Sequence, residues 1–184
     1  KLLGKHNVLN ATAALTVCLN LGVNQNIIKK SLEEFSGVQR RMTKILTTNH
    51  NDFYDDYAHH PTEISSILEG VKNVYQNRKI TSVFEPHRYS RVLSLKNEFA
   101  KSFQKSDLVL LCPLYAAGEK KNNRFNKYEF ARLISKFSKT QVVILKDQNE
   151  LNKYFQKNLT KNEIIIGMGA GMISKWMWDL KKIL

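Results

Sequence analysis

The strongest constraint on the fold is a regular alternation of short apolar segments with amphipathic segments from residue 42 onward. Runs rich in β-branched and other apolar residues predict strands at residues 43–47, 53–57, 80–84, 108–112, 142–145 and 164–166. Apolar residues at helical spacing predict helices between them, at residues 61–74, 90–104, 128–137, 148–156 and 172–180. We therefore expect an α/β fold with a mostly parallel six-stranded sheet and helices on both faces.

The first 41 residues show a different pattern. Apolar residues at helical spacing predict one helix at residues 7–22 and another at residues 24–35, and a glycine stands at or just after the end of each. Two helices alone bury little apolar surface. We therefore expect this segment to be the end of a domain whose body precedes residue 1.

The chain is strongly basic, with 29 Lys and Arg against 16 Asp and Glu and a formal net charge of +13. Because the lysines are spread along the chain, we favour a basic solvated surface and expect no nucleic-acid partner; a basic nucleic-acid-binding module remains the alternative from another functional class. No apolar run approaches the roughly 18 residues that span a bilayer, and the start lacks a signal-peptide core. We therefore expect a cytoplasmic protein without a membrane partner.

Four of the expected strands are followed by polar or glycine-rich segments. In parallel sheets, ligands bind beyond the carboxyl ends of the strands, where the following loops gather. The candidate segments are residues 55–60, 86–91, 115–119 and 167–171.

The first candidate segment, DDYAHHP at residues 55–61, admits three interpretations. Its carboxylates and imidazoles could bind a metal, but the spacing matches no established zinc motif, and we expect no metal site from this chain. A carboxylate at a strand end could instead accept hydrogen bonds from a ribose. The third interpretation is a cluster that caps the following helix, which begins at Pro61.

The second candidate segment, EPHRYSR at residues 85–91, places Arg88 and Arg91 three residues apart at the start of a helix, beside His87. Two guanidinium groups in this position could hold a carboxylate or phosphate. The alternative is a solvated basic helix start. Positive charge at a helix N-terminus opposes the helix dipole, which favours a nearby anion and hence the functional interpretation.

The glycine-rich segment GMGAG at residues 167–171 follows a strand and precedes a helix, as a phosphate-binding turn would. The full GxGxxG pattern is not met, because Met172 occupies the third glycine position. We therefore favour a tight strand-to-helix turn. The sequence contains no GxxxxGK[ST] motif for phosphate binding.

Taken together, six motifs in this order resemble the Mur ligase family over almost the whole chain. They are GKHNVLNATAAL at 4–15, FSGVQRR at 35–41, DDYAHHP at 55–61, EPHRYSR at 85–91, YAAGE at 115–119 and GMGAG at 167–171. The resemblance implies that residues 1–41 end a central ATP-binding domain and that residues 42–184 form the Rossmann-like C-terminal domain that binds an amino acid.

The resemblance also implies an activity in peptidoglycan synthesis. The motifs at 55–61 and 85–91 are similar to those of family members that join L-alanine to UDP-N-acetylmuramate with ATP, through an acyl phosphate. The murein tripeptide recycling ligases of the family resemble the first motif but depart at the second, and they remain an alternative. The P-loop lysine and the Mg²⁺ ligands would lie upstream, so partners include the upstream domains, and this chain alone is expected to be inactive.

The resemblance assigns nucleotide-binding residues by position. Asn7 and Asn10 match the asparagines that contact adenine, and they share one helix face. Arg41 matches an arginine near the ATP phosphates, for which we expect a catalytic role in stabilising charge. Asp56 matches the ribose-binding aspartate.

The remaining assignments concern the incoming amino acid. His87, Arg88 and Arg91 match the region that receives it, with a catalytic role expected for His87 and a carboxylate contact for the arginines. Four further residues are expected to be neighbours in the substrate site: His59, His60, Tyr115 and Glu119.

Overall fold

The computed structural model describes residues 5–184, without the side chains of residues 5 and 6, so Gly4 of the first motif lies outside the described residues. Within residues 5–184, the strands form one six-stranded sheet in the order β1-β2-β6-β3-β4-β5. Four of the five neighbouring pairs are parallel, which confirms the expected mostly parallel sheet, and β1 is antiparallel to β2. The strands are β1 (Thr43–Thr48), β2 (Asn51–Asp56), β3 (Lys79–Phe84), β4 (Leu108–Leu111), β5 (Gln141–Ile144) and β6 (Glu163–Met168).

Helices cover both faces of the sheet, and each layer has its own hydrophobic core. One face packs against α3 (Pro61–Val74), α4 (Tyr89–Ser94), α5 (Lys96–Lys101) and α6 (Lys127–Ser138). The other packs against α7 (Gln148–Asn158), α8 (Ile173–Asp179) and the following 3₁₀ turn (Leu180–Lys182). Ile164 and Ile166 enter the first core and Ile165 the second, because successive side chains of a strand point to opposite faces.

One helix differs from the expectation. The segment predicted as a single helix at 90–104 is divided into α4 and α5, because the backbone leaves helical geometry at Leu95 (φ −113°, ψ 27°). Phe99 of α5 and Phe103, just after it, both lie in the core, where their rings contact Phe84.

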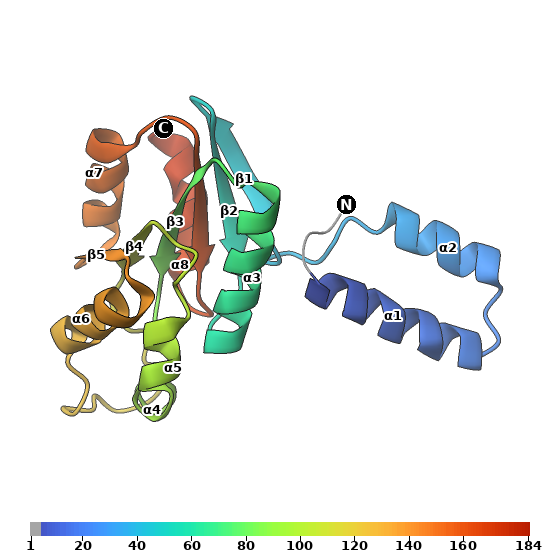
Figure 1. Cartoon of the computed structure of the whole chain (residues 1–184), viewed down its shortest axis with the longest axis horizontal. Helices are drawn as coiled ribbons and strands as arrows, with labels where there is room; N and C mark the ends of the chain where they lie inside the picture. The colour runs from blue at the N-terminus through green and yellow to red at the C-terminus, as the bar shows by residue number, and fades with distance from the viewer. Residues whose placement is uncertain (1–4) are drawn as a thin grey trace.

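α1 (Lys5–Asn20) and α2 (Gln25–Glu34) form a helical hairpin that projects from the sheet domain (Figure 1). Among the side chains described in this hairpin, Ile28 alone is buried, whereas Leu21 is 76% exposed. This agrees with the expectation that two helices make a poor core. No helix of the described residues combines the length and apolar character needed to cross a membrane.

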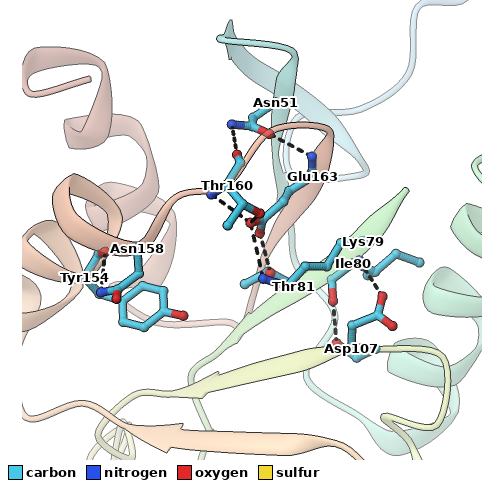
Figure 2. Close-up of polar contacts among 10 residues, drawn as sticks. Asn51, Lys79, Ile80, Thr81, Asp107, Tyr154, Asn158, Thr160 and Glu163 are labelled. Atoms are coloured by element: carbon cyan, nitrogen blue, oxygen red, sulfur yellow. Dashed lines mark hydrogen bonds and ion pairs between the residues drawn. The ribbon is translucent and has the colours of Figure 1, made fainter. Parts of the chain in front are cut away.

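A buried polar cluster joins the amino ends of β3 and β6 (Figure 2). The Glu163 carboxylate is 3% exposed and accepts hydrogen bonds from the Thr160 amide (3.0 Å), the Thr160 hydroxyl and the Thr81 hydroxyl (2.9 Å), with Lys79 Nζ at 3.3 Å. Asn51 donates to the Thr160 carbonyl (2.7 Å) and accepts from the Glu163 amide (2.7 Å). These bonds hold the β5-to-β6 crossover against the sheet edge opposite the four candidate loops.

Asp52 at the start of β2 makes the fold sensitive to acid. Burial alone raises the pKa of this carboxyl, but hydrogen bonds from Lys44 (2.6 Å), Thr47 (2.6 Å) and Arg78 (2.5 Å) outweigh burial and lower it to about 2. A carboxyl with a lowered pKa in the folded state stabilises the fold above its unfolded-state pKa of 3.8, and the contribution is lost as the pH falls toward the folded value.

Between about pH 5 and pH 2 we expect the wild type to lose about 2 kcal/mol more unfolding free energy than Asp52→Asn. Urea denaturation at each pH measures this difference. Other titrating groups are common to both proteins, so they cancel in the comparison. Parallel pH profiles for the two proteins would mean that the ion pairs of Asp52 do not persist in solution.

Candidate active site

Four strand-end loops meet at one edge of the sheet, because β2, β6, β3 and β4 are neighbours in that order. Backbone hydrogen bonds tie the loops together: Gly169 N donates to the Asp56 carbonyl (3.3 Å), Glu85 N to the Met168 carbonyl (2.9 Å) and Arg88 N to the Tyr115 carbonyl (2.9 Å). The segments singled out in the sequence at 55–60, 86–91, 115–119 and 167–171 therefore line a common rim.

Four rings lie in a row across this rim. Tyr57 contacts His59 (centroids 5.1 Å apart), His59 contacts His87 (5.7 Å), and His87 stacks on Tyr115 (5.6 Å, interplanar angle 22°). Tyr57 and Tyr115 are 37% and 39% exposed, so a ligand at the rim can reach both ends of the row.

His87 lies beside the positively charged arginines of the rim. Arg91 Nη1 lies 3.1 Å from His87 Nδ1, and this contact requires Nδ1 to accept, which leaves the proton of the neutral ring on Nε2. Burial lowers the pKa of His87, and the nearby charges of Arg91, His59 and Arg88 lower it further. His87 is therefore suited to donate a hydrogen bond from Nε2 as a neutral ring.

Arg88 has a backbone conformation that non-glycine residues rarely adopt, with φ 68° and ψ 129°. Such conformations cost about 1–3 kcal/mol and concentrate at functional sites. The backbone is held by the bond from Arg88 N to the Tyr115 carbonyl, and the side chain is exposed at the rim. Arg91 instead contacts His87, so the two arginines do not form a matched pair in this structure.

Glu119 supports the rim from the loop after β4. Its carboxylate accepts hydrogen bonds from the Ser90 amide (3.0 Å) and the Ser90 hydroxyl (2.5 Å), and these bonds lower its pKa. The Ser90 amide lies in the first turn of α4, where backbone N–H groups have no partner within the helix. Since α4 has no side-chain cap of its own, Glu119 supplies the acceptor for this amide. Glu119 therefore lies on the rim and supports the segment that carries Arg88, because it binds Ser90 two residues further along.

Several residues of the segment at 55–61 stabilise the fold through hydrogen bonds to the backbone. Asp56 is 1% exposed, and its two oxygens accept from the Met42 amide (2.8 Å) and the Ala58 amide (2.7 Å). Burial raises the pKa of Asp56 to about 6, although these amides and the charge of Arg41 lower it in part. A direct contact between Asp56 and a ribose stays a prediction. Each Asp56 oxygen has a second lone pair to accept such a bond, but at 1% exposure the carboxylate would first have to become accessible.

The two adjacent histidines have different positions. His60 caps α3, with Nδ1 accepting from the Thr62 amide (3.3 Å). His59 turns toward the rim, and its Nδ1 lies 2.9 Å from the Tyr57 carbonyl. His60 therefore caps α3, as the third interpretation of this segment proposed, and His59 lies on the rim.

A second candidate site is a cavity of about 590 Å³ between the helical hairpin and the sheet domain. Asn7 and Asn10 of α1 and Arg41, which follows α2, line this cavity. Their contact with a nucleotide stays a prediction. The polar wall of the cavity continues onto α3, and its apolar wall comes from both helices of the hairpin and from α3. The other lining residues are Ala11, Ala14, Leu32, Phe35, Val38, Thr62, Glu63, Ser66 and Ile67.

Glu85 is a residue that sequence reasoning missed. Its carboxylate is 3% exposed and accepts from the Met172 amide (3.1 Å) and the Ile173 amide (3.3 Å), and burial raises its pKa. These are the amides that a phosphate on GMGAG would use, which favours the tight-turn interpretation. A Cβ on Gly171 would lie 2.4 Å from Glu85 Oε2 and 2.6 Å from the Tyr115 ring, so glycine allows the turn to pack beneath the rim.

Arg40 was missed as well, although Arg41 beside it was assigned. The Arg40 guanidinium donates to the Gly169 carbonyl (2.6 Å) and lies over the Tyr57 ring (4.6 Å). The Arg40 carbonyl accepts from Tyr57 N (2.7 Å). Arg40 therefore anchors the linker to the sheet domain, and nothing in the sequence distinguishes its role from that of Arg41.

The sequence of the chain is similar to proteins of one known family. A family model described as "Mur ligase, glutamate ligase domain" matches residues 40–171. The chain belongs to the Mur ligase family. The match includes β1 to β6 and the four segments that line the rim, and it does not include the helical hairpin.

Individual Mur ligases match the chain over nearly its whole length. UDP-N-acetylmuramate–L-alanine ligase of Pelagibacter ubique is 49% identical over 183 residues, 100% of this chain and 39% of that protein. The Aquifex aeolicus ligase of the same name is 37% identical over 97% of this chain and 38% of that protein. The chain thus spans about two fifths of the length of the curated relatives it matches.

Solved structures show the same fold. UDP-N-acetylmuramate-alanine ligase from Thermotoga maritima superposes with a TM-score of 0.79 at 29% identity, covering 97% of this chain and 37% of that one. A murein peptide ligase from Psychrobacter arcticus superposes with a TM-score of 0.71 at 24% identity, over 98% of this chain and 37% of that one. At that identity the second match supports the fold alone.

Proposed function

We propose that this chain supplies the acceptor site and one wall of the nucleotide pocket of an ATP-dependent ligase that joins L-alanine to UDP-N-acetylmuramate. The relatives named for this reaction support the proposal. The observation that carries it in this chain is the meeting of His87, strained Arg88 and Tyr115 at the carboxyl edge of the sheet.

The proposed reaction has two steps. The lactyl carboxylate of UDP-N-acetylmuramate attacks the γ-phosphorus of ATP, which forms an acyl phosphate and releases ADP. The neutral amine of L-alanine then attacks the acyl carbon, the nitrogen loses a proton, and phosphate leaves with the C–O bonding pair. Mg²⁺, held by ligands outside this chain, would neutralise phosphate charge in the first step.

On the acceptor side, Arg88 is the group proposed to bind the L-alanine carboxylate, because its side chain is exposed and a guanidinium can bind both oxygens. Arg91 holds His87 in one tautomer, and Nε2–H of His87 can donate to oxygen that gains negative charge in the second step. His59 and Tyr115 flank His87 and limit the room around the acceptor.

On the nucleotide side, the cavity between the hairpin and α3 is proposed to receive adenosine. Its apolar wall suits a base. We propose that Asn7 and Asn10, which line the cavity, offer amide groups to that base and that Arg41 contacts the phosphates. We accordingly propose residues 1–41 as the end of the ATP-binding domain and residues 42–184 as the C-terminal domain. The reaction would take place in the cytoplasm and require the upstream domains.

The test is ATP-dependent phosphate release by the full-length protein with UDP-N-acetylmuramate, comparing L-alanine with the L-alanyl tripeptide as acceptor. Release with L-alanine is the expected result. Release with the tripeptide alone would reassign the protein to the recycling branch. No release with either acceptor, together with salt-sensitive binding of DNA or RNA, would replace the ligase proposal with a nucleic-acid-binding one.

A further inference from the structure

We propose that Glu63 of α3 is a positioning residue that couples the nucleotide cavity to the amino-acid acceptor site. The inference rests on the proposed function, because it takes the cavity as the ATP pocket and the rim as the L-alanine site. Glu63 lines the cavity, and the same carboxylate holds His59 of the rim. Occupancy of one site would therefore change the surroundings of the other.

The two carboxylate oxygens of Glu63 face in these two directions. Oε1 lies 4.0 Å from Arg41 Nη1, on the cavity side. Oε2 accepts from the backbone amides of His59 (3.0 Å) and His60 (3.2 Å) and lies 3.6 Å from His59 Nδ1, on the rim side. Glu63 and Arg41 are about one third and one half exposed, so a ligand can reach the pair.

His59 extends the connection to the acceptor residues. Its ring contacts His87 at 5.7 Å, and its side chain is 19% exposed, so it has little freedom to move independently. A phosphate that binds Arg41 competes with Glu63 for the guanidinium. The Glu63 charge is then balanced chiefly by the His59 and His60 contacts, which tightens the loop that carries His59.

A purely structural role is the alternative, since Glu63 is also the third residue of α3 and completes a capping box with His60. α7 provides a matched comparison. Glu150 occupies the same position in α7, accepts from the Lys146 amide (2.8 Å) and pairs with Lys146 Nζ (3.3 Å). Glu150 lines neither the cavity nor the rim, so it isolates the capping contribution.

Glu63→Gln separates the two roles. The glutamine carbonyl can still accept from the His59 and His60 amides, because Gln is compatible with a capping box. The substitution removes the negative charge opposite Arg41. We therefore expect the fold to persist and the coupling to be lost.

The first experiment measures the dissociation constant of L-alanine by equilibrium dialysis. It uses the full-length protein with UDP-N-acetylmuramate, with and without the Mg²⁺ complex of a non-hydrolysable ATP analogue. We expect the analogue to tighten L-alanine binding about 5-fold or more in the wild type and in Glu150→Gln, and less than about 2-fold in Glu63→Gln. An equal effect of the analogue in all three proteins would overturn the inference.

The second experiment follows the His59 imidazole by NMR in protein labelled at histidine, with His59→Gln used to assign the signal. Adding the ATP analogue is expected to shift this resonance in the wild type and to leave it in place in Glu63→Gln. If the analogue binds both proteins and shifts the signal equally, Glu63 has a capping role alone. If the wild type binds neither the analogue nor L-alanine, the proposed function itself fails, and the inference fails with it.

Discussion

Glu163→Ala is expected to lower the free energy of unfolding by about 3 kcal/mol, because the substitution leaves the buried Thr81 hydroxyl and the part-buried donors of Thr160 without their acceptor. The Thr160 amide, the Thr160 and Thr81 hydroxyls and Lys79 all point at the Glu163 carboxylate, as Figure 2 shows for this cluster. Although burial alone raises the pKa of Glu163, hydrogen bonds from Thr160 and Thr81 lower it overall, so the carboxylate is ionised near neutral pH.

Urea denaturation of Glu163→Ala, Glu163→Gln and Glu129→Ala would check this expectation. The glutamine variant retains one carbonyl oxygen and should lose about half as much as the alanine variant. The Glu129→Ala control removes a surface ion pair with Lys96 (2.6 Å) and should lose much less unfolding free energy than Glu163→Ala. A loss in Glu163→Ala no larger than in Glu129→Ala would show that water replaces the missing acceptor.

Arg88→Ala is expected to lower kcat/KM for L-alanine about 100- to 1000-fold in the full-length protein, the loss typical of a charge-assisted bidentate contact. The variant should unfold at nearly the wild-type temperature, since alanine and arginine both carry a Cβ and experience similar strain at φ 68°. The KM for ATP should change little, because Arg88 does not line the nucleotide cavity.

Two variants serve as controls for Arg88→Ala. Arg132 is exposed on α6, away from the rim, and Arg132→Ala should leave kcat/KM for L-alanine unchanged. Arg88→Lys keeps the charge but cannot bind two oxygens in one plane, so its activity should lie between those of the wild type and Arg88→Ala. Equal activities of Arg88→Ala and Arg132→Ala would mean that a residue other than Arg88 binds the L-alanine carboxylate.

The α/β class and most element positions could be predicted from local sequence. α3 spans Pro61–Val74, as expected, because Pro61 suits the first turn and the apolar residues recur at helical spacing. The strand Glu163–Met168 contains the predicted apolar run at 164–166. Where local geometry is irregular, prediction failed: no sequence signal marked Leu95 as the break between α4 and α5.

The candidate rim was predictable in outline, because loops that follow parallel strands must gather at the carboxyl edge of the sheet. The motifs therefore identified which segments carry His87 and Arg88. They did not show that Arg91 contacts His87 instead of pairing with Arg88, since that depends on the conformation of residues 87–91.

The sequence by itself determined the order of strands and helices, the four strand-end segments and the family resemblance, because each depends on residues close together in the chain. The tertiary structure alone decided which polar groups face the site. Asp56 is buried, Glu85 occupies the GMGAG amides, and Glu63 lies between the cavity and His59. These positions follow from strand order and helix packing, which bring together residues far apart in sequence, so no local pattern encodes them.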